Sequence, residues 1–104
     1  MARAVGLIEV YGLVAALVAG DAACKAANVR IEAFDRNRPP PTAEKVEVPL
    51  IILVKFRGNV EDVRAAMDAA EVAANKVSGV VSKYIIANPS GDTEKMLRLD
   101  GLNE

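Results

Sequence analysis

The sequence contains no histidine and no tryptophan, and it has a single cysteine among its 104 residues. Without histidine, the chain lacks the usual general base near neutral pH and the commonest protein ligand of metal ions. Cys24 cannot form an internal disulfide, and no histidine can activate it as a nucleophile. We therefore expect no enzyme activity, no metal and no cofactor, and we interpret Cys24 as a small packing residue.

An excess of charge of one sign is missing too. The chain has 13 basic and 14 acidic residues, which give a net charge of −1. Nucleic-acid-binding proteins usually carry a basic excess or a basic stripe. The few aromatic residues also lack the pattern with which a sheet stacks RNA bases. We therefore expect no nucleic acid as a partner.

Long hydrophobic runs are absent as well. The apolar stretch 7–20 contains Glu9 and ends at Asp21, so it is too short and too interrupted to span a bilayer. The N-terminus shows no signal-peptide pattern, and a single cysteine fits a reducing compartment. These features predict a cytoplasmic protein that does not bind a membrane.

The sequence does have a high hydrophobic content of 52%, which is enough for the core of one small domain spanning 1–104. Periodicity and capping residues predict the order β-α-β-β-α-β, followed by a short C-terminal helix. The predicted strands cover 4–10, 29–34, 46–56 and 80–87, and the predicted helices cover 13–28, the segment from Asn59 to Gly79, and the residues after Ser90.

This order predicts an α+β fold, a ferredoxin-like sandwich in which two helices cover one face of a four-stranded sheet. The other face then needs a partner, the last helix or solvent. Between the second and third strands, the prolines at 39–41 exclude a central strand. The segment 35–46 is therefore predicted to be a long loop with polyproline character.

The helix predicted at 13–28 is rich in alanine, which favours a helix. One stripe of this helix is expected to be buried, and its members are Leu13, Ala16, Leu17, Gly20, Cys24 and Ala27. A second stripe carries Asp21, Lys25 and Asn28. The spacing of four residues, with the acid first, predicts an ion pair between Asp21 and Lys25 on a solvated face.

Four segments of the chain form a recognisable series. They are GLIEVYGLV at 6–14, DAACKAANV at 21–29, VKFRG at 54–58 and IIANP at 85–89. In this order, and over a match from about Ala4 to Pro89, they resemble the shell proteins of bacterial microcompartments, in particular the single-domain type. The resemblance implies a non-enzymatic structural protein that forms cyclic homohexamers with a central pore. Such hexamers tile into a sheet with other shell proteins, and the sheet encloses enzymes in the bacterial cytoplasm.

The resemblance also implies where the edge of such a tile lies. Lys25 and Asn28 match the lysine and asparagine at the tile edge of the family. The long lysine stems can pack together while their ammonium groups donate to carbonyl oxygens of the neighbour. Asn88 stands where the family often has an arginine that reaches across this edge, so the edge contacts of this chain are expected to be weaker or differently arranged.

The pore of the family is lined by the loop between the second and third strands. Alignment back from Arg57 and Gly58 places the pore near Glu47, Val48, Pro49 and Leu50. If Glu47 faces the lumen, six carboxylates would disfavour anions. If Arg36, Arg38 or Lys45 faces the lumen, the sign reverses. The proline-containing loop either covers one mouth of the pore or lies on the surface without a role in transport.

Two other functions stay open at this point. A ferredoxin-like regulatory module could bind a small molecule between subunits, with the long loop as its ligand-binding element. A small enzyme that cleaves acyl groups or phosphates would need a catalytic pair, which the sequence does not offer.

Overall fold

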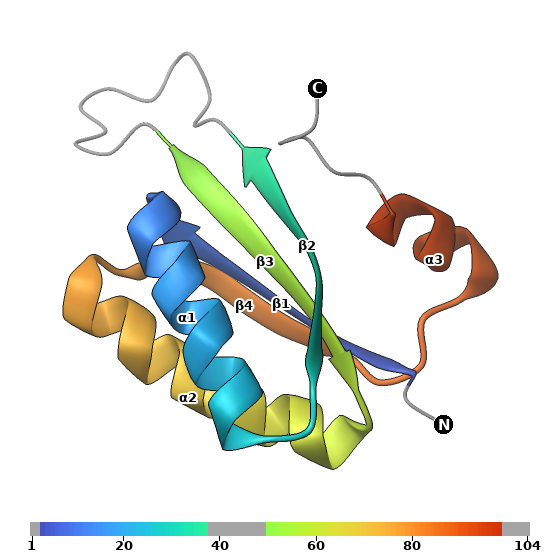
Figure 1. Cartoon of the computed structure of the whole chain (residues 1–104). Helices are drawn as coiled ribbons and strands as arrows, with labels where there is room; N and C mark the ends of the chain where they lie inside the picture. The colour runs from blue at the N-terminus through green and yellow to red at the C-terminus, as the bar shows by residue number, and fades with distance from the viewer. Residues whose placement is uncertain (1–2, 38–49, 99–104) are drawn as a thin grey trace.

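The computed structural model describes residues 3–37 and 50–98 of the chain, and these residues form four strands and three helices (Figure 1). The elements are β1 (Ala4–Tyr11), α1 (Leu13–Ala26), β2 (Arg30–Asn37), β3 (Ile51–Gly58), α2 (Val60–Val77), β4 (Val80–Ile86) and α3 (Gly91–Leu97). The predicted order of elements is confirmed. Most predicted boundaries lie within two residues of the observed ones.

The largest difference concerns the loop that was predicted to begin at Asp35. Instead, β2 continues through Asn37, because Asp35, Arg36 and Asn37 pair with Leu53, Ile52 and Ile51 of β3. Sequence composition at 35–37 is polar, but the adjacent strand offers backbone hydrogen bonds, and these decide the conformation. The proline-containing segment 38–46 lies outside the described residues.

The four strands form one antiparallel sheet in the order β2-β3-β1-β4. Each of the two long helices therefore joins strands that have one other strand between them: α1 joins β1 to β2 around β3, and α2 joins β3 to β4 around β1. This is the interleaved topology of a ferredoxin-like sandwich. The predicted α+β fold is confirmed.

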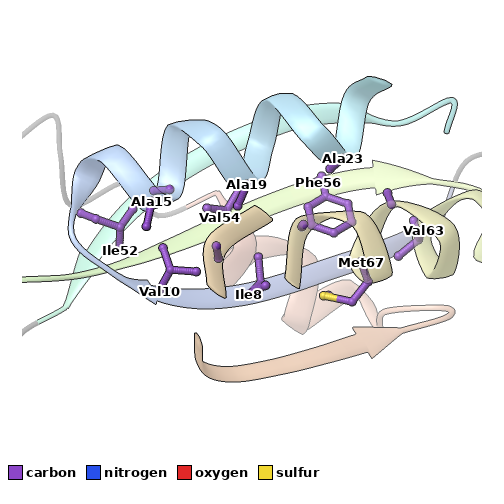
Figure 2. Packing of buried hydrophobic residues seen from close by; sticks show 14 of the residues in the cluster. Ile8, Val10, Ala15, Ala19, Ala23, Ile52, Val54, Phe56, Val63 and Met67 are labelled. Atoms are coloured by element: carbon purple, nitrogen blue, oxygen red, sulfur yellow. The ribbon is translucent and has the colours of Figure 1, made fainter. Parts of the chain in front are cut away.

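Both long helices lie on the same face of the sheet, where the core sits (Figure 2). Large side chains come from the sheet, chiefly Ile8, Ile52, Val54 and Phe56, and small ones come from α1. The alanines of α1 let its backbone approach the sheet closely. At Gly20 an added Cβ would lie 3.3 Å from Cδ1 of Ile31, which is a tight contact, so a larger residue would require the Ile31 side chain to shift by a few tenths of an ångström.

The stripe of α1 that was predicted to be buried is displaced from the observed one. The buried residues of α1 are Ala15, Ala16, Ala19, Gly20 and Ala23. Leu13 and Leu17 are 45% and 53% exposed, and Cys24 is exposed too, so its interpretation as a packing residue is wrong for the single chain. The prediction failed because the faces of an alanine-rich helix differ little in hydrophobicity. In the structure, the face with the smallest side chains packs against the sheet.

The second face of the sheet is covered in part by α3, which settles the open choice between a partner, the last helix and solvent for this part of the face. Ser90 caps α3 by accepting a hydrogen bond from the Thr93 N–H, at 3.2 Å. In α2 the predicted cap is also present, since Asn59 accepts from the Asp62 N–H at 2.8 Å.

Candidate functional site

The residues predicted at the tile edge gather at one end of the sheet. Ala4, at the start of β1, pairs with Gly58 at the end of β3, and Val5 pairs with Ile86 near the end of β4. The carbonyl oxygen of Asn28 lies 3.0 Å from the place where a Cβ of Gly58 would stand. The end of α1 with Lys25, the turn at Asn28 and the chain after β4 with Asn88 therefore meet here. We name this surface, formed by Arg3, Lys25, Asn28 and Asn88, the polar end.

Lys25 lies in the last turn of α1, where a cation complements the partial negative charge of the helix C-terminus. Its Nζ lies 2.8 Å from Oδ2 of Asp21, so the predicted ion pair is present, and both side chains are well exposed. The hydrogen bond to Asp21 and the attraction between the two charges raise the pKa of the Lys25 ammonium group. The lysine is therefore a solvated cation that stays charged at every physiological pH.

Asn28 follows α1 and has an exposed side chain. Its backbone N–H donates to Oδ1 of Asp62, at 3.4 Å, in the first turn of α2. Because Asp62 is itself held by the Asn59 cap, the turn after α1 is fixed to the start of α2. The Asn28 amide is thus presented to solvent from an ordered turn.

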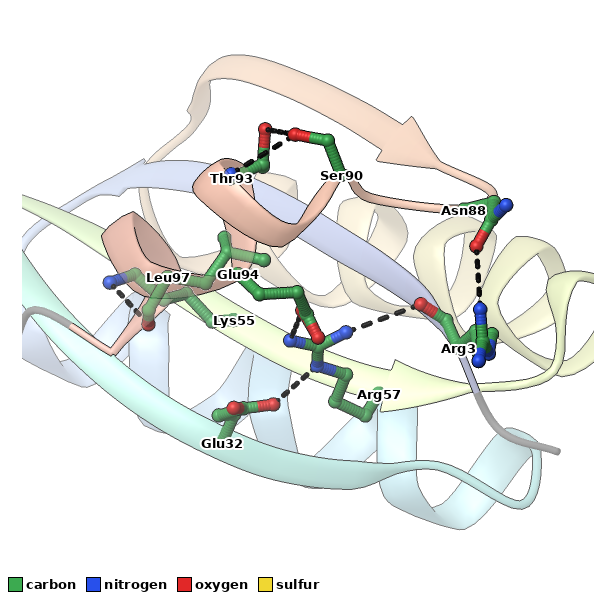
Figure 3. Close-up of polar contacts among 9 residues, drawn as sticks. All are labelled: Arg3, Glu32, Lys55, Arg57, Asn88, Ser90, Thr93, Glu94 and Leu97. Carbon is green, nitrogen blue, oxygen red and sulfur yellow. Dashed lines mark hydrogen bonds and ion pairs between the residues drawn. The ribbon is translucent and has the colours of Figure 1, made fainter.

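Asn88 accepts a hydrogen bond from Nη1 of Arg3, at 3.5 Å (Figure 3). Arg3 was not among the predicted site residues. Its position in the sequence carries no signal for this contact, because 85 residues separate it from Asn88 and only the pairing of β1 with β4 brings them together.

Leu50, one of the four residues predicted at the pore, lies at the opposite end of the sheet. Glu47, Val48 and Pro49 lie outside the described residues, whereas Leu50 is described and half-buried. The Leu50 carbonyl accepts a hydrogen bond from the Gly12 N–H, at 2.9 Å, and Leu50 packs against the core. Since β1 spans eight residues between the two ends, Leu50 and the polar end are about 23 Å apart at roughly 3.3 Å per residue.

Two buried cations lie under α3, and the sequence did not single them out. Lys55 is 3% exposed and Arg57 is 6% exposed. Lys55 Nζ donates to the Leu97 carbonyl at 3.2 Å and lies 3.5 Å from Oδ2 of Asp35. Arg57 donates through Nε to Glu32 at 2.5 Å and through Nη2 to Glu94.

The pair of carboxylates keeps the Arg57 guanidinium charged. Burial lowers the pKa of Arg57, but its hydrogen bonds to Glu94 and Glu32 outweigh this effect and raise the pKa above the ordinary value. The arrangement fixes α3 to the sheet and has the features of a structural ion-pair cluster: each cation is paired, and no described buried side-chain polar atom lacks a partner.

Among residues 3–37 and 50–98, no three histidine, cysteine or acidic side chains come close enough to hold a metal ion. In this part of the chain, no helix is both long enough and apolar enough to cross a membrane. Cys24 is an exposed thiol on α1, with Lys25 and Asp21 on the same helix bound to each other.

The outer surface of the two long helices is unusually apolar. Besides Leu13 and Leu17, α1 exposes Val14 and Val18. A groove of about 620 Å³ runs between the two helices on this side, and it is lined by Val18, Ala22, Asp68, Ala69, Val72, Ala73, Lys76 and Val77. Exposed apolar surface of this extent on one helix pair is typical of a surface that another protein covers.

Comparisons with known proteins agree with this picture. A family model described as the BMC domain matches residues 4–89. The bacterial microcompartment shell protein PduA of Citrobacter freundii is 37% identical over 95 residues, which are 91% of this chain and 91% of that protein. The bacterial microcompartment shell protein EutM of Salmonella typhimurium is 34% identical over 94 residues, 90% of this chain and 88% of that protein.

A solved structure of a microcompartments protein from Desulfitobacterium hafniense has a similar fold. The TM-score is 0.64 at 24% sequence identity, and the likeness covers 85% of this chain but only 42% of that one. At this identity the comparison supports the fold alone.

Proposed function

Because the chain belongs to the BMC-domain family of bacterial microcompartment shell proteins, we propose that it forms cyclic homohexamers that tile into a protein sheet. The relatives are shell proteins, so a structural rather than an enzymatic role is confirmed. We also propose that the hexamer has a central pore and that 1–104 acts as one shell domain. Other shell proteins and enclosed enzymes would be its partners inside the bacterial cytoplasm.

The observation that carries the proposal is the outward face of α1. Leu13, Leu17 and Cys24 recur at spacings of four and seven residues, so they share one side of the helix. All three are exposed in the single chain. These are three of the six residues in the stripe that the sequence predicted to be buried. A neighbouring subunit in a ring would bury these side chains and so satisfy the pattern.

The distance between the two ends of the sheet supports a radial arrangement. A closed ring places one end of every subunit at the axis and the other end at the rim. The polar end carries Lys25, Asn28 and Asn88, and the opposite end carries Asn37 and Leu50, the described residues on either side of the segment 38–49. We therefore propose that the polar end is the rim, and that Glu47, Val48, Pro49 and Leu50 lie near the axis.

The polarity of a pore built in this way would depend on the side chains of the segment 38–49. Six copies of Glu47 at the axis would favour neutral and cationic metabolites over anions. Leu50 is held by the Gly12 N–H next to the ordered end of the sheet. Because Leu50 directly follows Glu47, Val48 and Pro49 in the sequence, this hydrogen bond fixes the position of the residue next to the proposed pore-lining residues.

The oligomeric state tests this proposal directly. Native mass spectrometry of the wild-type chain at micromolar concentration should give six times the protomer mass. Leu17→Gln should weaken the ring, because it places an amide in the proposed subunit contact, while circular dichroism should show an unchanged fold. A matched control is Lys95→Gln, a change at an exposed residue of α3 away from both long helices, and it should leave the hexamer intact. A wild-type chain that stays monomeric or forms trimers would contradict the proposal.

A further inference from the structure

Arg3 is an exposed arginine at the polar end, and neither the resemblance nor the comparisons assign it a role. Arg3 directly precedes β1, and its Nη1 donates a hydrogen bond to the Asn88 amide oxygen, at 3.5 Å (Figure 3). Ala4, the next residue, pairs with Gly58, which contacts Asn28. Arg3 therefore contacts Asn88 directly and lies, with Asn28, at the end of the sheet where β1 begins.

The backbone of Arg3 is fixed by a buried group. The Arg3 carbonyl accepts a hydrogen bond from Nη1 of Arg57, at 3.2 Å. Arg57 is itself held between Glu32 and Glu94, so its guanidinium cannot turn away. Because this contact uses only the carbonyl, any side chain at position 3 leaves it in place. The Arg3 guanidinium thus projects from an ordered point at the edge of the molecule.

The Arg3 guanidinium also has unused binding capacity. It offers five N–H donors, and the neutral Asn88 amide engages one of them. Among residues 3–37 and 50–98, no carboxylate lies within ion-pair distance of Arg3, in contrast to Lys25, Lys83, Lys95 and Arg57. A guanidinium held in this way is suited to bind carboxylate or carbonyl oxygens of a partner.

We propose that Arg3 is an edge-binding residue whose guanidinium donates hydrogen bonds to a second copy of this chain in the neighbouring tile. Asn88 orients the guanidinium, and the cation missing at position 88 is thereby supplied from the start of β1. The inference rests on the proposed function, since it needs tiles that meet at the polar end. In a two-fold contact between tiles each side donates from its own Arg3, so the interaction occurs twice.

The test compares sheet formation by Arg3→Ala with that of the wild-type protein, by electron microscopy and by sedimentation of assembled material. Arg3→Ala should remain hexameric and should raise the protomer concentration needed for sheets by roughly three- to tenfold, the loss expected for exposed charge-assisted contacts. Arg3→Ala combined with Asn88→Arg should restore sheets, because the guanidinium then comes from position 88. Arg98→Ala, which removes an exposed arginine next to α3, is the matched control and should have no effect.

The outcomes separate this inference from the function on which it rests. If Lys25→Ala impairs sheets while Arg3→Ala forms them at the wild-type concentration, the role of Arg3 is refuted and the polar end remains the edge. If Arg3→Ala breaks the hexamer itself, Arg3 belongs to a contact within the ring and the inference is also refuted. A wild-type chain that forms neither hexamers nor sheets overturns the proposed function together with the inference.

Discussion

Gly6 of β1 is paired with Phe56 of the adjacent strand β3, and the aromatic ring of Phe56 occupies the space that a side chain at position 6 would take. A Cβ on Gly6 would lie 2.4 Å from Cε2 and 2.5 Å from Cζ of Phe56. Phe56 is fully buried beneath the helices and is the largest such side chain among the described residues (Figure 2). The centre of the core therefore depends on a glycine in a strand, where glycine by itself is unfavourable.

Gly6→Ala should destabilise the protein by about 1–3 kcal/mol, because the added methyl group forces the Phe56 ring out of its rotamer. Urea denaturation at one fixed protomer concentration measures the effect, since assembly contributes to apparent stability. Gly91→Ala is the control, because nothing lies within 4 Å of its added Cβ. In the double variant with Phe56→Leu, part of the loss at Gly6 should disappear. Strict additivity of the two changes would mean that the clash is relieved elsewhere.

Arg57 fixes three segments at once: β2 through Glu32, the start of β1 through the Arg3 carbonyl, and α3 through Glu94. Arg57→Met should destabilise the protein by about 2–4 kcal/mol, because the buried guanidinium is removed and Glu32 loses its partner. Hydrogen exchange should increase in α3 and at the start of β1 more than in α2.

Lys95→Met is the control for this change. Lys95 pairs with Asp92 at 3.8 Å, but both side chains are exposed, so the expected loss is below about 0.5 kcal/mol. Equal losses for the two variants would show that the Arg57 cluster contributes no more than a surface pair.

The sequence was sufficient to predict the elements that local rules determine. The caps at Asn59 and Ser90, the break at Gly12 and the pair Asp21–Lys25 all depend on residues within four positions of one another. The end of β2 and the buried face of α1 depend on neighbouring elements. The strand was predicted to end three residues too early, and of the predicted stripe of α1 only Ala16 and Gly20 are fully buried. Arg3 and Arg57 could not be found from local patterns, because their partners lie 25 to 85 residues away.

Gly12 joins β1 to α1 with φ 88° and ψ 157°, a combination that is essentially restricted to glycine. Gly12→Ala should destabilise the protein by about 1–3 kcal/mol through backbone strain alone. Thermal unfolding at fixed concentration measures this loss. Gly79→Ala is the control, since its added Cβ would make only ordinary contact with Tyr11, at 3.5 Å, and its φ is not in the positive range. A neutral Gly12→Ala would show that the turn relaxes without strain.

Lys25→Ala should leave the hexamer intact and impair the formation of sheets, if the polar end is the edge of the tile. The side chain is exposed and pairs only with Asp21 on its own helix, so its loss should change protomer stability by less than about 0.5 kcal/mol. Asp21 raises the pKa of Lys25, so the ammonium group stays charged as the pH passes the ordinary lysine pKa. The charge is lost only when the pH rises through the raised pKa. Any contribution of Lys25 to sheet formation should therefore be constant between neutral and mildly alkaline pH.

The control for Lys25→Ala is Lys95→Ala, which removes an exposed lysine of α3. Native mass spectrometry measures the hexamer, and electron microscopy measures the sheets. Loss of the hexamer in Lys25→Ala would instead place this residue within the ring.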